Sequence, residues 1–386
     1  MSSVLSDRRS TRFLPNLKSE IRALRRLLHQ HPEPGFGEFE TARILRQFLT
    51  DHGIRFRSLK TGTVVDLGRP RVAIRSDIDG LPILERTGLS YRSQNKGWMH
   101  ACGHDFHMAI AMMTLMRLKE AKIKGVRIIF QPSEEGPESG AKFLIEKGVL
   151  NGIRAIFALH LEPGIRFGRI GIRSGPFMAA ANHFRIVIRG KASHAALPHL
   201  GQDTIRIGAR LIQDIQALIA RSKNPIKPGL ITIGRITGGE RFNVLAKETI
   251  MEGTIRALEL GMLKKLKRRL TRLAQGLKHD YGVEVETEFS EDHPPVVNDD
   301  QLVEMVIKGA IEVLGEEGVV GVPPTMGSED FSYYQQKIPG VMFMLGCRDE
   351  KLGAIYPLHH DRFRASDSVI EPGSEILYRC VQSYLS

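Results

Sequence analysis

The stretch RVAIRSDI, residues 71–78, predicts a buried β-strand, because a short apolar run is combined here with β-branched side chains. Two further stretches predict strands of the same kind, GVRIIFQP at residues 125–132 and RAIFALHL at residues 154–161. Helical patterns lie between them, FHMAIAMMTLMRLKEA at residues 106–121 and SGAKFLIEKGVL at residues 139–150. This alternation predicts an α/β fold with a mostly parallel central sheet.

Polar side chains follow each of these predicted strands. They fall where each strand ends: Asp77 and Asp79 at the end of the first, Glu134 and Glu135 after the second, and His160 at the end of the third. In an open α/β sheet, ligands bind beyond the carboxyl ends of the strands. We therefore expect a functional site at this edge.

The pattern changes near residue 180. The stretches that follow predict the order β-α-β-β-α-β, at residues 183–190, 203–222, 229–236, 248–258, 263–281 and 282–289. This order is typical of a split-βαβ (ferredoxin-like) domain. A helix at Asp300–Leu314, a strand at residues 340–346 and a C-terminal helix then resume the first pattern. We expect one domain of residues 1–180 and 293–386, interrupted by another of residues 181–292.

The composition is that of a soluble globular protein. Of the 386 residues, 42% are hydrophobic and 25% are charged. No apolar run approaches the roughly 20 residues that span a bilayer, and the first residues lack the apolar core of a secretory signal. The three cysteines show no disulfide-like spacing. We therefore expect a cytoplasmic protein without a membrane partner.

The formal net charge of +12 raises the alternative of nucleic-acid binding. Its densest source is residues 263–282, where leucines recur every three or four residues and basic side chains occupy the opposite helical face. No recognised nucleic-acid fold or interleaved aromatic residues accompany this helix. We interpret it as solvated helix surface and expect no nucleic-acid partner.

The stretch HACGHDFHMA, residues 100–109, holds a Cys-x-His pair, Cys102 and His104. Thiolate and neutral imidazole are both good metal ligands, but two donors do not make a site. Further candidates are Glu134, Glu135 and His160, with His359 and His360 far downstream. Each alone is more often solvated surface or a satisfied core residue. Their shared place at one predicted sheet edge favours a metal site.

Ten ordered motifs resemble one known family, the M20 metallopeptidases, and within it the amidohydrolase branch of N-acyl-amino-acid, hippurate and auxin-conjugate hydrolases. The matching runs are LHQHPEPGFGEFET, RSDIDGLP, MHACGHDFH, IIFQPSEEG, FALHLEP, SHAALPH, FNV, GTIR, MGSEDFSYY and LHHDRF. They extend from Leu28 to near the C-terminus. The resemblance implies a zinc-peptidase-like catalytic domain interrupted by a lid domain.

The resemblance also implies two divalent metal ions. Their ligands would be Cys102, His104, Glu135, His160 and His359. The Cys102 thiolate would bridge the two ions, where most relatives in the wider family use an aspartate. Mixed sulfur, nitrogen and oxygen donors suit zinc, manganese, cobalt or nickel, and the sequence does not choose among them. His107 is left over, and we expect it to position other groups.

Glu134 would be the general base, taking a proton from a water that bridges the metal ions and delivering it to the leaving amine. Asp79, a catalytic residue by this resemblance, and Asp77 would orient the site without binding metal. In the wider family a ligand histidine occupies the place of Asp77.

In the lid, His194, Asn243 and Arg256 would bind substrate, with His194 also stabilising the oxyanion. In several relatives two lids pair edge to edge, and the lid histidine reaches the partner's active site. We therefore expect a homodimer formed through the lid. The runs NVLAK and LHHDRF depart from the usual family sequences, which puts the acyl-group preference in doubt.

The activity that follows is metal-dependent cleavage of N-acyl or N-aroyl amino acids. An N-acetyl-diaminopimelate deacetylase and a short-peptide metallopeptidase are the alternatives within the enzyme class. A relative that binds ligand without turnover is a third alternative, but it would not need Glu134.

Overall fold

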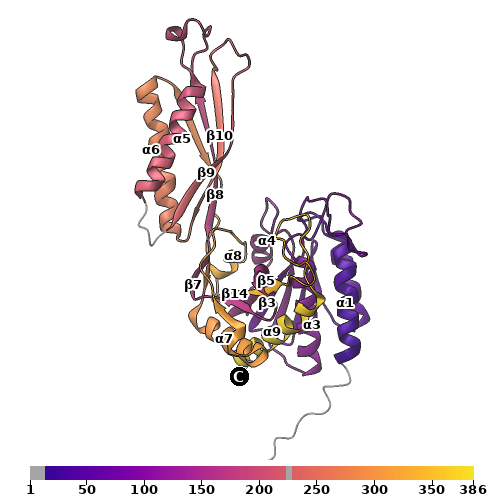
Figure 1. Ribbon diagram of the computed structural model, residues 1–386. Helices are drawn as coiled ribbons and strands as arrows, with labels where there is room; N and C mark the ends of the chain where they lie inside the picture. The colour runs from indigo at the N-terminus through magenta and orange to yellow at the C-terminus, as the bar shows by residue number, and fades with distance from the viewer. Residues whose placement is uncertain (1–13, 223–227) are drawn as a thin grey trace, which may run out of the picture. The chain divides into compact units, whose positions relative to one another are not determined.

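The computed structural model describes residues 14–222 and 228–386, and the chain divides into two compact units (Figure 1). The first unit comprises the described residues up to Gly175, Val297–Pro323 and Tyr333–Ser386, and the second comprises Pro176–Val296 and Pro324–Ser332. The boundaries expected after residues 180 and 292 lie close to the crossing points at Gly175 and Val296. The return of residues 324–332 to the second unit is not predicted by the sequence pattern.

The first unit is built on an eight-stranded mixed sheet. In sheet order the strands are β1 (Arg57–Leu59), β2 (Gly62–Leu67), β4 (Val126–Gln131), β3 (Val72–Asp77), β5 (Ala155–Arg166), β14 (Gly340–Arg348), β6 (Ile170–Ile172) and β13 (Val319–Gly321). The four central strands β4, β3, β5 and β14 are parallel, as the sequence predicts. Antiparallel pairing is confined to the flanks, where β1, β2 and β6 lie.

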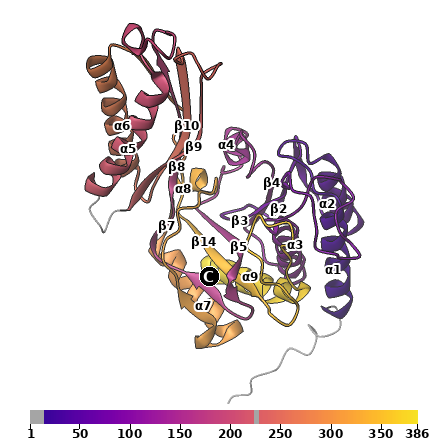
Figure 2. The ribbon, with the colours of Figure 1, turned by 45° about the horizontal axis from the view of Figure 1, so that its top comes forward.

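The helices of this unit cover the sheet. They are α1 (Leu14–Gln30), α2 (Phe39–Asp51), α3 (His104–Glu120), α4 (Gly140–Glu146), α7 (Asp300–Leu314) and α9 (Ile370–Leu385), and the short α8 (Ser332–Gln335) starts at the last boundary. Among them α3 is buried on nearly every side, and it contacts β3, α1 and α9 (Figure 2). An apolar helix enclosed in this way gives the residues at its N-terminus a rigid base.

The direction in which strands are added to the sheet reverses at β3. The chain leaves β3 through α3 to reach β4 on one side, then returns through α4 to β5 on the other side. The carboxyl ends of strands on either side of such a reversal leave a crevice between the diverging loops. Asp77 at the end of β3, Glu134 after β4 and His160 within β5 all come from these three strands.

The second unit is a four-stranded antiparallel sheet with two helices. Its elements are β8 (Ala180–Arg189), α5 (Thr204–Ser222), β9 (Gly229–Gly238), β10 (Glu248–Ala257), α6 (Leu260–Tyr281) and β11 (Glu284–Phe289). The strand order β11-β8-β10-β9 is the ferredoxin-like arrangement of a β-α-β-β-α-β chain. Two short strands, β7 (Gly175–Met178) and β12 (Val296–Asn298), lie where the chain passes from one unit to the other. Turns of 3₁₀ helix lie at Pro198–Leu200, Glu316–Gly318 and Asp367–Val369.

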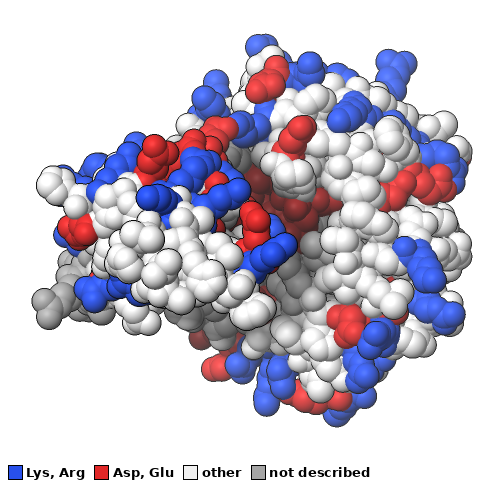
Figure 3. All heavy atoms as spheres, turned by 90° about the horizontal axis from the view of Figure 1, so that it is seen from above, with Lys and Arg blue, Asp and Glu red and all other residues white. Residues whose placement is uncertain are grey.

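Each unit has its own apolar core. In the second unit Leu263, Leu266 and Leu270 of α6 are buried against the sheet, so the basic side chains of this helix are left on its outer face. Basic and acidic side chains are interspersed on the surface shown in Figure 3. None of the described helices, in residues 14–222 and 228–386, is long and apolar enough to cross a membrane.

Candidate metal centre

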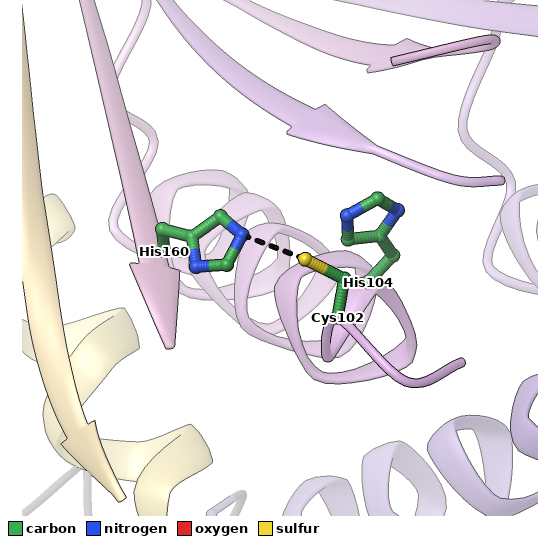
Figure 4. Close-up of side chains that lie close together, drawn as sticks. All are labelled: Cys102, His104 and His160. Atoms are coloured by element: carbon green, nitrogen blue, oxygen red, sulfur yellow. Dashed lines mark hydrogen bonds between the residues drawn. The ribbon is translucent and has the colours of Figure 1, made fainter. Parts of the chain in front are cut away.

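Cys102 lies in the loop before α3, between two histidines. Gly103 takes a left-handed conformation, with φ of 84°, and this turn directs the chain into α3 at His104. The Cys102 Sγ atom lies 3.3 Å from Nε2 of His160 and 3.3 Å from Nε2 of His359. Figure 4 shows the His160 ring pointing at the sulfur from β5, with His104 beside it. One buried thiol therefore contacts two imidazoles that are 199 residues apart in the sequence.

His359 reaches this thiol from a loop in a strained conformation. Its φ is 62°, in the left-handed region that side chains other than glycine rarely adopt. The backbone N–H of His359 donates to the carbonyl of Ala101 at 2.9 Å. This hydrogen bond ties the C-terminal loop to the Cys102 loop.

The His104 ring is oriented by Asp79. Its Nδ1 lies 2.9 Å from the Asp79 backbone carbonyl and 3.2 Å from Asp79 Oδ1. Its Nε2 is buried and has no hydrogen-bond partner among residues 14–222 and 228–386, although Asp77 Oδ2 lies 3.9 Å away. A buried nitrogen of this kind is costly unless something coordinates it. With Nδ1 donating to Asp79, Nε2 is available as a ligand atom.

The two glutamates of the loop after β4 lie on the same side of the site. One ligand atom from each of Glu134, Glu135 and His104 lies within 4.8 Å of the others. Glu135 Oε1 is 2.9 Å from Nε2 of His359. The backbone N–H of Glu135 donates to Asp79 Oδ2 at 2.9 Å, so Asp79 contacts both His104 and the glutamate loop.

These donors fall into two groups that share one atom. Cys102, His104 and His160 form one set of mutually close ligand atoms, and Cys102, Glu135 and His359 form another. A thiolate can bridge two cations, and each group offers nitrogen or oxygen donors beside it. All five residues expected to bind metal are thus brought together, and they fit two metal ions.

The electrostatics of the site also fit cations. Burial raises the pKa of the Cys102 thiol well above its usual value, and the Glu135, Glu134 and Asp77 carboxylates raise it further. Burial alone would lower the pKa of His104, but Asp77 and Asp79 raise it to about 10. The protein therefore gathers more negative charge here than its own side chains balance. Bound cations would supply the missing charge and favour the thiolate.

Asp77 and His107 form a buried pair behind these donors. His107 Nδ1 lies 2.7 Å from Asp77 Oδ1, and His107 Nε2 accepts the backbone N–H of Leu161 at 2.9 Å. Both ring nitrogens are therefore in use, and the positioning role of His107 stays a prediction. Sequence reasoning missed Arg75, whose Nη1 donates to Asp77 Oδ2 at 2.6 Å. The sequence could have indicated this contact, because Arg75 lies inside an apolar, buried strand and a buried charge needs a partner.

The three residues expected to bind substrate in the second unit are not all together. His194 pairs in a β-bridge with Val244, and the Ala195 N–H donates to the Asn243 carbonyl at 2.9 Å, so His194 and Asn243 are neighbours. Arg256 is near the far end of β10, where its Nη1 donates to the Met326 carbonyl at 3.0 Å. The nine residues of extended strand from Glu248 to Arg256 span roughly 25 Å.

Comparison with known proteins identifies the family. Residues 73–383 match peptidase family M20/M25/M40. The chain belongs to this family. An N-acetyl-L-cysteine deacetylase of Bacillus subtilis (strain 168) is 36% identical over 96% of this chain and 90% of its own length. An N-acetyldiaminopimelate deacetylase of Geobacillus sp. (strain WCH70) is 37% identical over 92% of this chain and 95% of its own length.

Solved structures of the M20 family share the fold. The crystal structure of the Bacillus subtilis YXEP protein, described as a dinuclear metal-binding peptidase of the M20 family, is 33% identical. It superimposes with a TM-score of 0.84 over 96% of this chain and 99% of its own. The M20 resemblance and the α/β fold expected from the sequence are confirmed, and the chain is a member of a hydrolase family.

Proposed function

We propose that the protein is a dinuclear metal-dependent amidohydrolase that cleaves N-acyl or N-aroyl amino acids. The observation that carries this proposal is the position of Cys102, which is shared by two groups of ligand atoms. Cys102, His104 and His160 would hold one divalent ion, and Cys102, Glu135 and His359 the other. Zinc, manganese, cobalt and nickel all suit these donors.

Bound metal ions would lower the pKa of a water molecule and polarise the substrate carbonyl. The protein's own groups then divide the remaining work. Glu134 takes a proton from the attacking water and delivers it to the nitrogen of the leaving amine. Asp79 fixes His104 in the tautomer that leaves Nε2 free for metal, and it holds the Glu135 backbone. Glu135 serves as a ligand, so the adjacent carboxylates have separate roles.

The relatives' names support the substrate class. Both deacetylases act on an N-acetyl group carried by an amino acid, according to those names. The second of them also favours the alternative that N-acetyldiaminopimelate is the substrate here. A short-peptide peptidase is the remaining alternative. A screen of N-acetyl, N-benzoyl and N-indoleacetyl amino acids, N-acetyldiaminopimelate and dipeptides would separate them, with the protein loaded in turn with each of the four metals.

Metal removal tests the proposal directly. We expect chelation to abolish hydrolysis and Cys102→Ala to lose most of its bound metal. Cys380→Ala is the matched control, because Cys380 is also a buried free thiol but lies in α9. Elemental analysis and activity are measured on the same samples. Full hydrolysis by metal-free protein would show that the proposed mechanism is wrong.

We also propose that the protein works as a homodimer paired through the second unit. Arg256 and the His194–Asn243 pair are too far apart within that unit to meet one small substrate. The supporting feature is β9, an edge strand of the sheet, with exposed apolar side chains nearby at Ile236, Phe242 and Val244. An unprotected sheet edge is suited to pairing with another chain. His194 and Asn243 would then act at the partner's site.

A further inference from the structure

The segment HPEPGFGE, residues 31–38, contacts both loops that carry the site, although none of its residues is among the candidate ligands. Its last residue, Glu38, is completely buried. Glu38 Oε1 accepts the backbone N–H of Ser133 at 2.8 Å, and Glu38 Oε2 accepts the Thr61 hydroxyl at 2.7 Å. Ser133 is the residue directly before Glu134 and Glu135. The carboxylate therefore holds the first residue of the glutamate loop.

Ser133 is held in a conformation that it would not adopt by itself. Its φ is 51°, in the left-handed region, which costs a side chain other than glycine roughly 1–2 kcal/mol. Three hydrogen bonds keep it there: the bond from its N–H to Glu38, a bond from its Oγ to the Glu138 carbonyl at 2.6 Å, and a bond from Gly140 N–H to its carbonyl at 2.9 Å. The conformation determines the direction in which the next two residues leave β4.

Two glycines make room for the Ser133 side chain. A Cβ atom at Gly35 would lie 2.5 Å from Ser133 Oγ, and one at Gly136 would lie 2.3 Å from it. Gly35 belongs to the 31–38 segment and Gly136 to the glutamate loop, so the serine hydroxyl is enclosed from both sides. Because not even a Cβ atom would fit at Gly35 or Gly136, the glutamate loop has no room to shift without moving the 31–38 segment too.

The same segment holds the loop after β3. The Glu33 carbonyl accepts the backbone N–H of Gly80, next to Asp79, at 2.7 Å. The Glu33 carboxylate in turn accepts the Thr41 N–H at 2.8 Å and the Thr41 hydroxyl at 2.9 Å, at the start of α2. One short segment, anchored on a helix, thus contacts the loops of Asp79 and of Glu134 and Glu135.

We propose that Glu38 is a positioning residue, and that its hydrogen bond to Ser133 sets the placement of the Glu134 and Glu135 carboxylates. This inference rests on the proposed function, in which Glu134 is the base and Glu135 a metal ligand. Displacing a catalytic group by about 1 Å can cost roughly 10²-fold in rate. Glu38 is not one of the candidate ligands, and its contact with the glutamate loop is the hydrogen bond to Ser133.

Substitution of Glu38 tests the proposal. In Glu38→Ala both acceptors are lost, and we expect kcat at saturating metal to fall roughly 10- to 100-fold with little change in KM. Glu38→Gln should restore most of the rate, because its carbonyl can accept the Ser133 N–H while its amide donates to the Thr61 hydroxyl. Glu40→Ala, which removes a partly exposed carboxylate two residues away, should match the wild type.

Hydrogen exchange of residues 133–140 gives a second measurement that does not depend on activity. We expect faster amide exchange in this segment for Glu38→Ala, and wild-type exchange for Glu38→Gln and Glu40→Ala. Folded Glu38→Ala protein with wild-type kcat and wild-type exchange would overturn the proposal. So would a Glu38→Gln variant that is as impaired as Glu38→Ala.

A pair of substitutions in the loop remains informative if Glu38→Ala does not fold. Gly136→Ala puts a methyl group against Ser133 Oγ, so we expect a large fall in kcat. Ser133→Ala removes that oxygen, and the new methyl group at 136 would then lie 3.6 Å from the Cβ of residue 133, an ordinary contact. The double variant should therefore be at least several times faster than Gly136→Ala. A double variant no better than Gly136→Ala would contradict the proposed packing.

The catalytic role of Glu134 and the positioning role of Glu38 can be tested separately. If Glu134→Gln keeps full activity, the proposed function is wrong, whatever Glu38 does. If Glu134→Gln is inactive while Glu38→Ala is fully active and exchanges normally, only the positioning role is wrong.

Discussion

The Asp79 carboxylate accepts the backbone N–H of Glu135 with one oxygen, while its other oxygen lies 3.2 Å from Nδ1 of His104. One side chain therefore orients a candidate ligand from α3 and the loop that carries another. Asp79→Ala should weaken metal binding by roughly 10- to 100-fold, the usual effect of losing a group that orients ligands. Titration of metal-free protein with zinc or manganese measures this. Asp66→Asn is the control, because it removes a carboxylate on β2 that pairs with Arg127 of β4. Unchanged metal affinity in Asp79→Ala would contradict the assigned role.

The adjacent glutamates should respond differently to the same substitution. Glu134→Gln keeps the shape of the side chain but removes the base, so metal content should persist while kcat falls by roughly 10²–10⁴. Glu135→Gln should lose metal instead, because Glu135 contacts His359 within the second donor group. Metal analysis and steady-state kinetics on both variants test this. Similar behaviour of the two variants in both assays would refute the division of labour.

The proposed dimer makes a quantitative prediction about mixed subunits. His194→Ala and Glu134→Gln homodimers should each be nearly inactive, since a lost oxyanion donor typically costs 10²–10³ in rate. Co-refolding the two variants produces heterodimers in which one site has both groups. With random pairing, about a quarter of wild-type activity should return. His183→Ala, which replaces an exposed histidine on β8, should behave as wild type and controls for surface substitution. Recovery of no activity, or an active monomeric wild type, rules out a shared site.

Stability should depend on pH through His29. Burial lowers the pKa of His29, but the Asp105 carboxylate 2.8 Å away and Glu85 outweigh this and raise it to about 9, against a smaller opposing effect of Arg25. Because the folded-state pKa is above the unfolded value, the stabilisation is complete below about pH 6.5 and is lost as pH rises through about 9. It amounts to roughly 3 kcal/mol.

The measurement is the melting temperature of metal-loaded protein between pH 6 and 10, for the wild type and for His29→Gln. We expect the difference in melting temperature between the wild type and His29→Gln to shrink as pH rises through about 9. If the melting temperature of His29→Gln lies below that of the wild type by the same amount at every pH, His29 is not protonated in the folded protein in the way proposed.

Sequence patterns predicted the elements that are periodic, and predicted less where the chain is irregular. The expected helix Asp300–Leu314 agrees with α7, because Asp299 caps it and Gly315 ends it. The strand expected at residues 154–161, which ends next to His160, continues to Arg166, because its later residues pair with β14. The return of residues 324–332 to the second unit left no periodic signal.

The same limit applies to the site. The candidate ligands could be named from Cys, His and Glu placed after strands, because their chemistry is visible in the sequence. The contacts of Glu38 could not be predicted in this way. Glu38 is buried and Glu40 is partly exposed, and nothing in the neighbouring sequence distinguishes the two glutamates. Its role depends on a left-handed serine 95 residues away and on two glycines, which only the folded chain brings together.

The place of β14 has a consequence for synthesis. The second unit is almost complete once residue 296 has emerged from the ribosome, whereas β14, formed by residues 340–348, lies between β5 and β6 in the middle of the first unit's sheet. Until β14 has been synthesised, β5, a strand of twelve residues, has an unpaired edge on the side where β14 will lie. Exposed edges of this length invite pairing with other chains. We therefore expect the nascent first unit to be vulnerable to aggregation until β14 has been synthesised and has paired with β5.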